Sequence, residues 1–481
     1  MSELASEPFS TERPRTRTPS AVTSIALGRK PAEPGRDLPE LAESIRYVRS
    51  LDKPTAAEVL RGARDSGRVA VQPRCGVGGH QAMLALLREL EAEAEPDILT
   101  ITIDAHTRLK RFDNALRSLN LNPADLNGYP LVTHGWQRGR ELNEAVRRPI
   151  EIRHGSPDAR ILFDVSVASG ITSFEGGGIS YNLPYSKAVP LADSLSAWRD
   201  VDAVAGELAR GGLVIDRELF GTLTAVLVPP SISLAIGVLE AVSAARQGVR
   251  CISISYPQSG HIYQDVAALR SVAELARRYL PADVEVFPVL HEFMGVFPRG
   301  RRNAEELIFY GAMAARLGGA AKIITKTYQE AFGIPDTRAN VDGMRLAAVA
   351  NSSLLDFVTV DEERVGEELE WVLQEVDEIV APVLDCADLQ HGIVTAFEQG
   401  RLDIPFSASK YARSDIIPRR DPGGAIRYHS AGALPLSQRT LRRNRSQLGL
   451  SAEVDMGTLM AGLTDDINYF IRLFGEDNPS A

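Results

Sequence analysis

The most constraining feature of this 481-residue chain is an alternation of short apolar runs with amphipathic stretches between about residues 60 and 330. Short runs bounded by turn residues are typical of buried strands, and longer stretches with a helical repeat are typical of helices. In the clearest part, strands are predicted over 224–228, 251–255, 284–290 and 322–326, and helices near 231–247, 264–279 and 303–317. Gly248, Pro281 and Gly318 stand where these helices should end.

Four further runs, at 69–72, 98–103, 129–133 and 150–152, bring the number of predicted strands to eight. Eight short strands separated by helices indicate an α/β fold of the closed (β/α)8 TIM-barrel type. An open, doubly wound sheet is the alternative that the same alternation allows.

The regions on either side of this pattern are different. Residues 1–45 are rich in Ser, Thr, Pro and Arg and lack a hydrophobic repeat, so a disordered tail is predicted there. The barrel is predicted to span residues 46–345. The chain then becomes acidic and helical over 361–379, and irregular over 403–432. Residues 346–481 are therefore expected to form an additional α-rich and irregular C-terminal region packed on the barrel.

Composition excludes several classes of partner. The chain has 53 Lys and Arg against 63 Asp and Glu, a formal net charge of −10, which disfavours binding to nucleic acid or to anionic membranes. Three widely spaced cysteines without a CxxC pair argue against a disulfide framework or a zinc site. No apolar stretch approaches the roughly 20 residues of a membrane span. A cytoplasmic protein is predicted.

Three arginines, Arg74, Arg108 and Arg153, each follow a predicted strand within six residues. In a parallel barrel the segments that follow the strands meet at one mouth, where the active sites of such barrels lie. A guanidinium group is always charged and pairs bidentately with a carboxylate. Three converging arginines therefore predict a site for a small dicarboxylate.

Two other segments contribute candidates to the same mouth. The glycine-rich segment 175–185 carries Glu175, Tyr181 and Tyr185 and is predicted to be a loop. The loop could close over a ligand or could be an ordinary turn with outward tyrosines. Lys326, with Glu330 four residues later, could be a Schiff-base lysine, a charge that holds a polar cofactor, or half of a surface ion pair. No His, Asp and Glu spacing predicts a metal site.

Several longer motifs carry a resemblance to a known family. The segments 102–108 (TIDAHTR), 126–130 (LNGYP), 153–158 (RHGSPD), 175–185 (EGGGISYNLPY), 220–224 (FGTLT), 227–233 (LVPPSIS), 264–268 (QDVAA), 297–298 (FP), 333–335 (GIP) and 403–407 (DIPFS) closely resemble the epsilon subunit of glutamate mutase, also called methylaspartate mutase. The resemblance covers roughly residues 60–435.

The resemblance implies a TIM-type barrel that binds adenosylcobalamin together with a small sigma subunit, whose DxHxxG segment ligates cobalt. It implies an isomerase that interconverts L-glutamate and threo-3-methylaspartate by a radical rearrangement, and a dimer of this chain within a heterotetramer. The positions that match the family's substrate contacts are Arg74, Arg108, Arg153, His154, Glu175, Tyr181 and Tyr185. Those that match its cofactor contacts are Gly76, Asn127, Pro184, Phe297, Lys326, Glu330 and Ile334. Of these, Glu175, Arg108, Lys326 and Glu330 are predicted to be catalytic.

The chain also departs from the family pattern. It contains no DxHxxG, because Leu109 stands where the glycine would follow Asp104 and His106, so a separate sigma partner is predicted. The segments 259–263, 292–296 and 328–329 differ from the family's usual residues, which leaves the exact substrate open. Two other functions remain open. One is a cofactor-free lyase or aldolase that acts on an amino dicarboxylate through Lys326. The other is a catalytically silent subunit that binds an amino acid.

Overall fold

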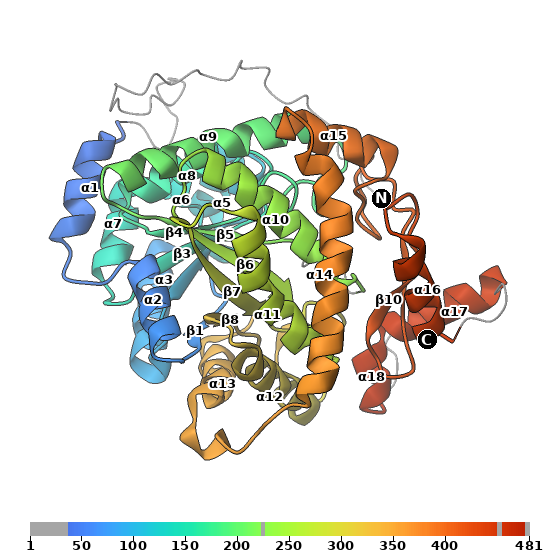
Figure 1. The fold of residues 1–481 in the computed structure, drawn as a ribbon. Coiled ribbons are helices and arrows are strands. Elements are labelled where there is room, and N and C mark those ends of the chain that lie inside the picture. The colour runs from blue at the N-terminus through green and yellow to red at the C-terminus, as the bar shows by residue number, and fades with distance from the viewer. Residues whose placement is uncertain (1–36, 223–226, 450–454, 477–481) are drawn as a thin grey trace.

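A computed structural model describes residues 37–222, 227–449 and 455–476, and its core is a barrel of eight parallel strands (Figure 1). The strands are hydrogen-bonded in the order β1-β8-β7-β6-β5-β4-β3-β2. They comprise β1 (Ala70–Gln72), β2 (Leu99–Thr102), β3 (Ile150–Arg153), β4 (Ser173–Glu175), β5 (Asp216–Leu219), β6 (Cys251–Pro257), β7 (Glu285–His291) and β8 (Lys322–Ile324).

The barrel closes between β1 and β2 through the segment that follows β1. The amide of Asp97 donates to the carbonyl of Val71 at 2.9 Å, and the amide of Thr102 donates to the carbonyl of Cys75 at 2.8 Å. All the strand pairings around the sheet are parallel, so the carboxyl ends of the eight strands face one mouth.

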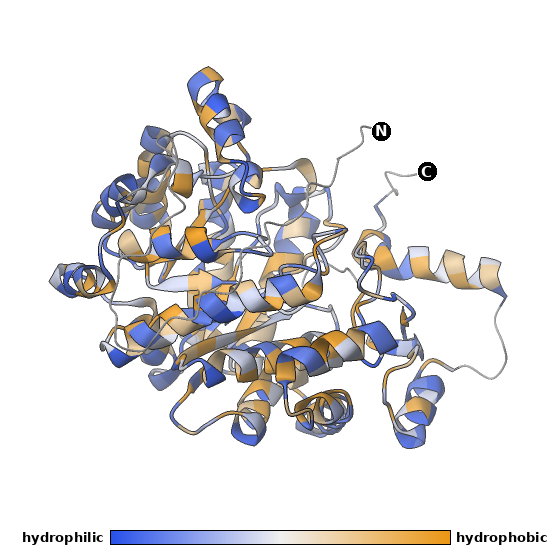
Figure 2. Cartoon of the chain, turned by 90° about the horizontal axis from the view of Figure 1, so that it is seen from above, coloured by the Kyte–Doolittle hydropathy of each residue, from blue (hydrophilic) through white to orange (hydrophobic). Residues whose placement is uncertain are grey.

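Helices surround the barrel and carry hydrophobic and hydrophilic stripes along their length (Figure 2). Two of them, α1 (Leu41–Ser50) and α2 (Ala56–Asp65), precede β1. Those between or just after the strands are α3 (His80–Ala94), α4 (Ala105–Arg108), α5 (Phe112–Leu121), α6 (Leu131–His134), α7 (Trp136–Glu144), α8 (Arg160–Ala168), α9 (Leu191–Arg210), α10 (Pro230–Arg246), α11 (Ile262–Tyr279), α12 (Arg301–Gly318) and α13 (Thr337–Ala347).

Local sequence explains where the helices begin and end. Thr55 and Glu58 form a capping box at the start of α2, and Pro230 occupies the first turn of α10. Gly319 ends α12 in a left-handed conformation, with φ of 68°.

The chain after the barrel is helical with one small hairpin. It comprises α14 (Glu362–Leu384), α15 (Leu389–Gln399), β9 (Ile417–Arg420), β10 (Ile426–Ser430), α16 (Gln438–Gln447), α17 (Met456–Ile467) and α18 (Tyr469–Leu473). Figure 1 shows α14 lying along α10 and α11, which it contacts over most of its length. Phe470 of α18 packs on Phe293 and Phe297, in the loop that follows β7.

The predicted barrel is confirmed, with corrections to individual strands. Six of the predicted strands are present, and the prediction of a strand over 129–133 is wrong. Only Tyr129 forms a bridge there, with Ile103, and the chain after Pro130 enters α6, because proline fixes φ and removes a backbone donor. The predicted strand over 224–228 lies mostly outside the described residues, and Leu227 and Val228 are not in a strand. β4 and β5 were not predicted.

The predicted tail over 1–45 lies mostly outside the described residues. Its end overlaps a helix, because α1 begins at Leu41 and buries Leu41, Ser44 and Val48. Among the described residues, no helix combines the length and the apolar character that crossing a bilayer requires.

Candidate active site

The carboxyl ends of the first four strands bring the predicted mouth residues together. Arg74 lies two residues beyond β1, and Arg108 ends the short helix α4 that follows β2. Arg153 is the last residue of β3 and Glu175 is the last residue of β4. Since neighbouring parallel strands are in register here, Arg153 and Glu175 lie at almost the same height in the barrel.

Arg153 and Glu175 form a buried ion pair. The Nη2 atom of Arg153 lies 2.6 Å from Oε1 of Glu175, and the two side chains are 5% and 1% exposed. The guanidinium also lies 3.5 Å from Glu151 and 3.7 Å from Glu218. Burial raises the pKa of Glu175 well above its ordinary value, and the repulsion from Glu218 and Glu151 adds to this, while Arg153 opposes it. A charged group of a ligand that enters this site must therefore compete for Arg153 or for Glu175.

The three arginines all act electrostatically on one side chain, Tyr185. Burial and Glu175 raise the pKa of Tyr185, whereas Arg74, Arg108 and Arg153 all act on it in the opposite direction. Arg74 lies 3.5 Å from Glu330. Among the described residues, Arg108 has one hydrogen bond, from Nε to the carbonyl of Ile103 at 2.6 Å, and no acidic partner. Its remaining donors are therefore free for a ligand.

The glycine-rich loop turns Tyr181 inward. Tyr181 is fully buried, and its hydroxyl donates to the carboxylate of Glu175 in a short hydrogen bond. Gly176 has φ of 111°, and a Cβ there would lie 2.3 Å from the Tyr181 ring, so glycine is required for this packing. Tyr185 remains 41% exposed. The loop is therefore a packed part of the site, with one tyrosine inside it and one at its edge.

Glu240 of α10 holds the loop from behind. Its carboxylate accepts hydrogen bonds from the amides of Ile179 and Ser180, at 2.8 and 2.9 Å, and from the Ser180 hydroxyl at 2.9 Å. Burial raises the pKa of Glu240 to about 7, although these hydrogen bonds oppose the shift.

Replacing Glu240 by Gln is expected to change how stability depends on pH. The carboxyl binds a proton more tightly in the folded chain, so its contribution to stability falls as pH rises from its ordinary pKa of 4.5 to about 7. Glu240→Gln should remove this fall and keep the loop, whereas Glu240→Ala should cost about 1–3 kcal/mol for each amide left unpaired. Urea unfolding at the two ends of this pH window measures both effects. An unchanged pH profile in Glu240→Gln would rule out Glu240 as the group responsible.

His154 is neutral and has an unused nitrogen. Burial, together with Arg108 and Arg217, lowers its pKa well below the ordinary value. Its Nδ1 accepts from the amide of Ser156 at 3.1 Å, and within the described chain its buried Nε2 has no partner. A buried polar atom without a partner is unfavourable unless a ligand or water satisfies it, so His154 is suited to contact a ligand.

A cluster of buried charged side chains, which was not predicted from the sequence, lies inside the barrel below the mouth. Nζ of Lys322 in β8 lies 2.5 Å from Glu151, 2.6 Å from Glu218 and 4.0 Å from Asp216, and all four side chains are fully buried. Burial alone would lower the pKa of Lys322, but the three carboxylates together raise it. Lys322 therefore stays charged. The alternation Ile150–Arg153, with charges at every second position, was the available signal for inward-facing charge.

Glu175, Glu218 and His291 form a further unanticipated group, whose potential metal-ligand atoms lie within 4.8 Å of one another. Nε2 of His291 lies 2.7 Å from Glu218. Arg153 is already paired with Glu175, and Lys322 with Glu218. Because cationic side chains neutralise both carboxylates, the group is better described as part of the charge network than as a metal centre.

The predicted cofactor positions fall into two sets. At the end of β8, Lys326 is buried and ion-paired with Glu330, and Ile334 and Phe332 are 65% and 68% exposed. Burial and Arg74 lower the pKa of Lys326 to about 8, although Glu330 opposes this.

The second set of predicted cofactor positions has structural contacts. Gly76 is buried against β2, Asn127 accepts from the amide of Ala105, Pro184 is half-buried in the loop, and Phe297 is buried beside Phe293.

The segment that begins like DxHxxG has a local structural role. Oδ1 of Asp104 caps α4 by accepting from the amides of His106 and Thr107, at 2.8 and 3.1 Å. Asp104 is fully buried in this position. The segment is therefore built to place Arg108 at the end of α4.

The chain is similar to known proteins over most of its length. A family model described as "Methylaspartate mutase E chain (MutE)" matches residues 52–468. The glutamate mutase epsilon subunit of Escherichia coli O157:H7 is 39% identical over 419 residues, which cover 84% of this chain and 86% of that protein. The epsilon subunit of Desulfitobacterium hafniense (strain Y51) is 38% identical over 425 residues, 86% of this chain and 88% of the other. That of Halobacterium salinarum (strain ATCC 700922 / JCM 11081 / NRC-1) is 38% identical over 423 residues, with the same two coverages.

Proposed function

Because this chain belongs to the methylaspartate mutase E chain family, we propose that it is the catalytic subunit of a glutamate mutase that interconverts L-glutamate and threo-3-methylaspartate with adenosylcobalamin. The observation that carries the proposal is the buried Arg153–Glu175 pair beside the unpaired donors of Arg108. Together they offer two kinds of charge at one small site.

The substrate groups have matching partners at the mouth. The two carboxylates of glutamate would be bound by Arg108 with Arg74 and by Arg153, since guanidinium groups pair bidentately with carboxylates. The ammonium would be bound by Glu175, which Tyr181 orients through its hydroxyl. His154 would donate one further hydrogen bond through Nε2, because its Nδ1 accepts from the amide of Ser156. The ammonium of the substrate would thus replace Arg153 as the partner of Glu175, and a carboxylate would replace Glu175 as the partner of Arg153.

The residues at the end of β8 fit a large coenzyme with apolar and amide edges. Phe332 and Ile334 expose apolar surface beside the Lys326–Glu330 pair, which offers both a cation and an anion. When bound, adenosylcobalamin supplies the radical that starts the rearrangement. The chain's own task is to hold the substrate by both ends and to exclude water. In this proposal Lys326 and Glu330 hold the coenzyme, as do Gly76, Asn127, Pro184, Phe297 and Ile334.

A separate small sigma subunit with a DxHxxG segment is proposed to ligate the cobalt. The corresponding segment of this chain is used to cap α4, which leaves His106 adjacent to a buried structural aspartate. We also propose that two copies of this chain pair within a heterotetramer. The proposed domain limits remain those of the sequence, with the barrel at 46–345 and the C-terminal region at 346–481.

The deciding experiment mixes the chain with a sigma partner, adenosylcobalamin and L-glutamate, and follows methylaspartate by NMR. Formation of methylaspartate that requires all components supports the proposal. Borohydride trapping of substrate on Lys326 without coenzyme would instead support a cofactor-free lyase or aldolase. Saturable glutamate binding without turnover in the complete mixture would indicate a silent amino-acid-binding subunit.

The affinity for the coenzyme is expected to weaken as pH rises through about 8, because Lys326 then loses its charge and leaves Glu330 without a near cation other than Arg74. Stability should change in the opposite direction. The unfolded chain binds more protons on Lys326 between its folded pKa of about 8 and its ordinary pKa of 10.5, so this group makes stability rise across that window. Spectrophotometric titration of adenosylcobalamin into the complex at several pH values measures the affinity. The Lys326→Met variant should bind adenosylcobalamin more weakly at neutral pH, and its affinity should not change as pH rises through about 8. If the affinity of Lys326→Met changed with pH as it does in the wild type, Lys326 would not be the group responsible.

A further inference from the structure

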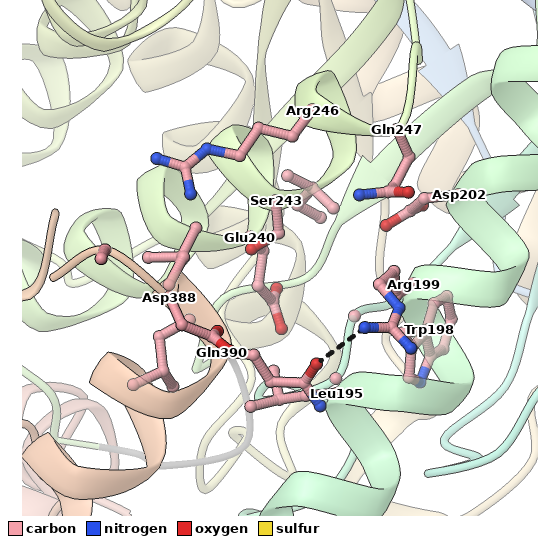
Figure 3. A pocket seen from close by; sticks show the side chains of 16 residues that line it. Leu195, Trp198, Arg199, Asp202, Glu240, Ser243, Arg246, Gln247, Asp388 and Gln390 are labelled. Carbon is pink, nitrogen blue, oxygen red and sulfur yellow. Dashed lines mark hydrogen bonds between the residues drawn. The ribbon is translucent and has the colours of Figure 1, made fainter. Parts of the chain in front are cut away.

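A second cavity lies behind the glycine-rich loop, away from the barrel mouth. Its volume is about 340 Å³, and it is bounded by α9, α10, α15 and the loop residues Gly177 and Gly178 (Figure 3). Cavities of this size are typical of small-molecule sites. The apolar part of its lining is formed by Leu195, Leu219, Leu389 and Ile393, all of which are buried.

Two polar side chains that line this cavity have hydrogen-bonding capacity that is not used. Asp202 is 6% exposed, and Arg217 binds its Oδ1 at 2.9 Å, while Oδ2 has no donor among the described residues. Trp198 is 2% exposed, and no acceptor for its indole N–H exists within the described chain. The two residues are four apart on α9 and therefore share one face of the helix. Their unused acceptor and donor are therefore available to a ligand in the cavity.

The rim of the cavity carries the opposite charge. Arg246 of α10 is exposed and makes no ion pair or hydrogen bond within the described ranges. Across the opening, Arg199 donates to Gln390 of α15 at 3.4 Å, a bond drawn in Figure 3, and Gln390 donates to the carbonyl of Ala192 at 2.9 Å. The rim thus offers an unpaired guanidinium, and its closing contacts are single polar bonds that can open.

The cavity also touches the group that holds the active-site loop. Glu240 lines it and accepts hydrogen bonds from the amides of Ile179 and Ser180. A Cβ on Gly177 would lie 2.3 Å from the Glu240 carboxyl, so the loop and this side chain are in direct contact. Glu175 and Tyr181 lie on the other side of the same loop.

We propose that this cavity binds a small apolar amino acid, or a related molecule with one amine, one carboxylate and an apolar body. The amine pairs with Oδ2 of Asp202, the carboxylate pairs with Arg246, and the apolar body packs between Leu195 and Ile393. A ligand here contacts Glu240 and the back of the loop, so its binding is coupled to that of glutamate at the mouth. The site is separate from the one proposed for the substrate.

The test measures direct binding to the full-length chain by isothermal titration calorimetry, so it does not depend on turnover. The probes are L-leucine and L-phenylalanine, with 3-phenylpropionate, which lacks the amine, and 2-phenylethylamine, which lacks the carboxylate. Saturable binding of either amino acid, with at least about tenfold weaker binding of both truncated probes, is the expected result. Failure of both amino acids to bind, or equal binding of the truncated probes, would overturn the proposal.

Matched variants locate the binding. Ser243 lines the cavity from a half-buried position on α10, so Ser243→Trp should fill it and abolish binding, while Ser243→Ala should not. Arg246→Gln should weaken the binding of both amino acids about tenfold, whereas replacing the exposed Arg277 of α11 by Gln should not change it. Binding that survives both Ser243→Trp and Arg246→Gln lies elsewhere and contradicts the assignment.

A final titration tests the coupling. The amino acid should change the affinity of the chain for L-glutamate. Because linkage is reciprocal, L-glutamate should change the affinity for the amino acid by the same factor. Simple competition between the two would place the amino acid at the barrel mouth and overturn the proposal. Glutamate affinity that is the same at all concentrations of the amino acid would overturn the coupling.

Discussion

Replacing Arg108 by Gln is expected to reduce kcat/KM for methylaspartate formation by between roughly 30-fold and a few thousandfold, while leaving the fold intact. Removing one partner of a desolvated charge pair costs about 2–5 kcal/mol, and the proposed pair here is between Arg108 and a substrate carboxylate. In the ligand-free chain Arg108 has one backbone hydrogen bond and no acidic partner among the described residues, so folding depends little on it.

The control for this variant is Arg117→Gln. Arg117 is exposed on α5, and no ion pair or hydrogen bond of its side chain is present in the described part of the chain, so its loss should change neither turnover nor stability. Steady-state kinetics of the reconstituted enzyme and urea unfolding of the chain separate the two effects. If Arg108→Gln kept full activity, or lost activity only in proportion to unfolded protein, Arg108 would not bind the substrate.

Replacing Lys322 by Met is expected to destabilise the barrel by about 3–5 kcal/mol, because breaking a buried ion pair by removing one partner leaves buried charge uncompensated. Glu151 and Glu218 lie 2.5 and 2.6 Å from Lys322 and have no contact with solvent. Methionine fills most of the same volume, so the loss reports mainly on charge. The midpoint of urea unfolding at neutral pH measures it.

A second substitution tests the cause of this loss. In Lys322→Met with Glu151→Gln, one of the two uncompensated carboxylates is neutral, so the double variant should be more stable than Lys322→Met alone. The two substitutions are in contact and should be strongly non-additive. Additive effects would mean that the loss in Lys322→Met comes from packing.

The barrel could be predicted from sequence because most of its strands have aliphatic cores of regular length. β4 and β5 could not, since Ser173–Glu175 and Asp216–Leu219 are short and place polar side chains inside the barrel. Such inward polar residues break the apolar run that marks a buried strand. Conversely, 129–133 contains aliphatic residues of strand type, but the chain after Pro130 is helical and only Tyr129 reaches the sheet.

The candidate site could be predicted only in part for a similar reason. Arg74, Arg108 and Arg153 were found because each follows a strand, and the loop 175–185 because its glycines exclude regular structure. Lys322 and Glu218 were not, since their contact joins β5 and β8, which are far apart in sequence. Nothing local to Lys322 distinguishes it from a surface lysine. Only the closed barrel brings these charges within hydrogen-bond distance.

In the proposed binding mode, the Arg153–Glu175 pair also determines which small charged molecules the site excludes. A plain dicarboxylate such as succinate could bind Arg153, but Glu175 would then lose its cationic partner, and its buried carboxyl would have to take up a proton. An amine without carboxylates could bind Glu175, but Arg153 would then keep only its longer contacts with Glu151 and Glu218. In the proposed binding mode, a molecule that carries both charges replaces each member of the pair as the other's neighbour, whereas a molecule with one kind of charge replaces only one member.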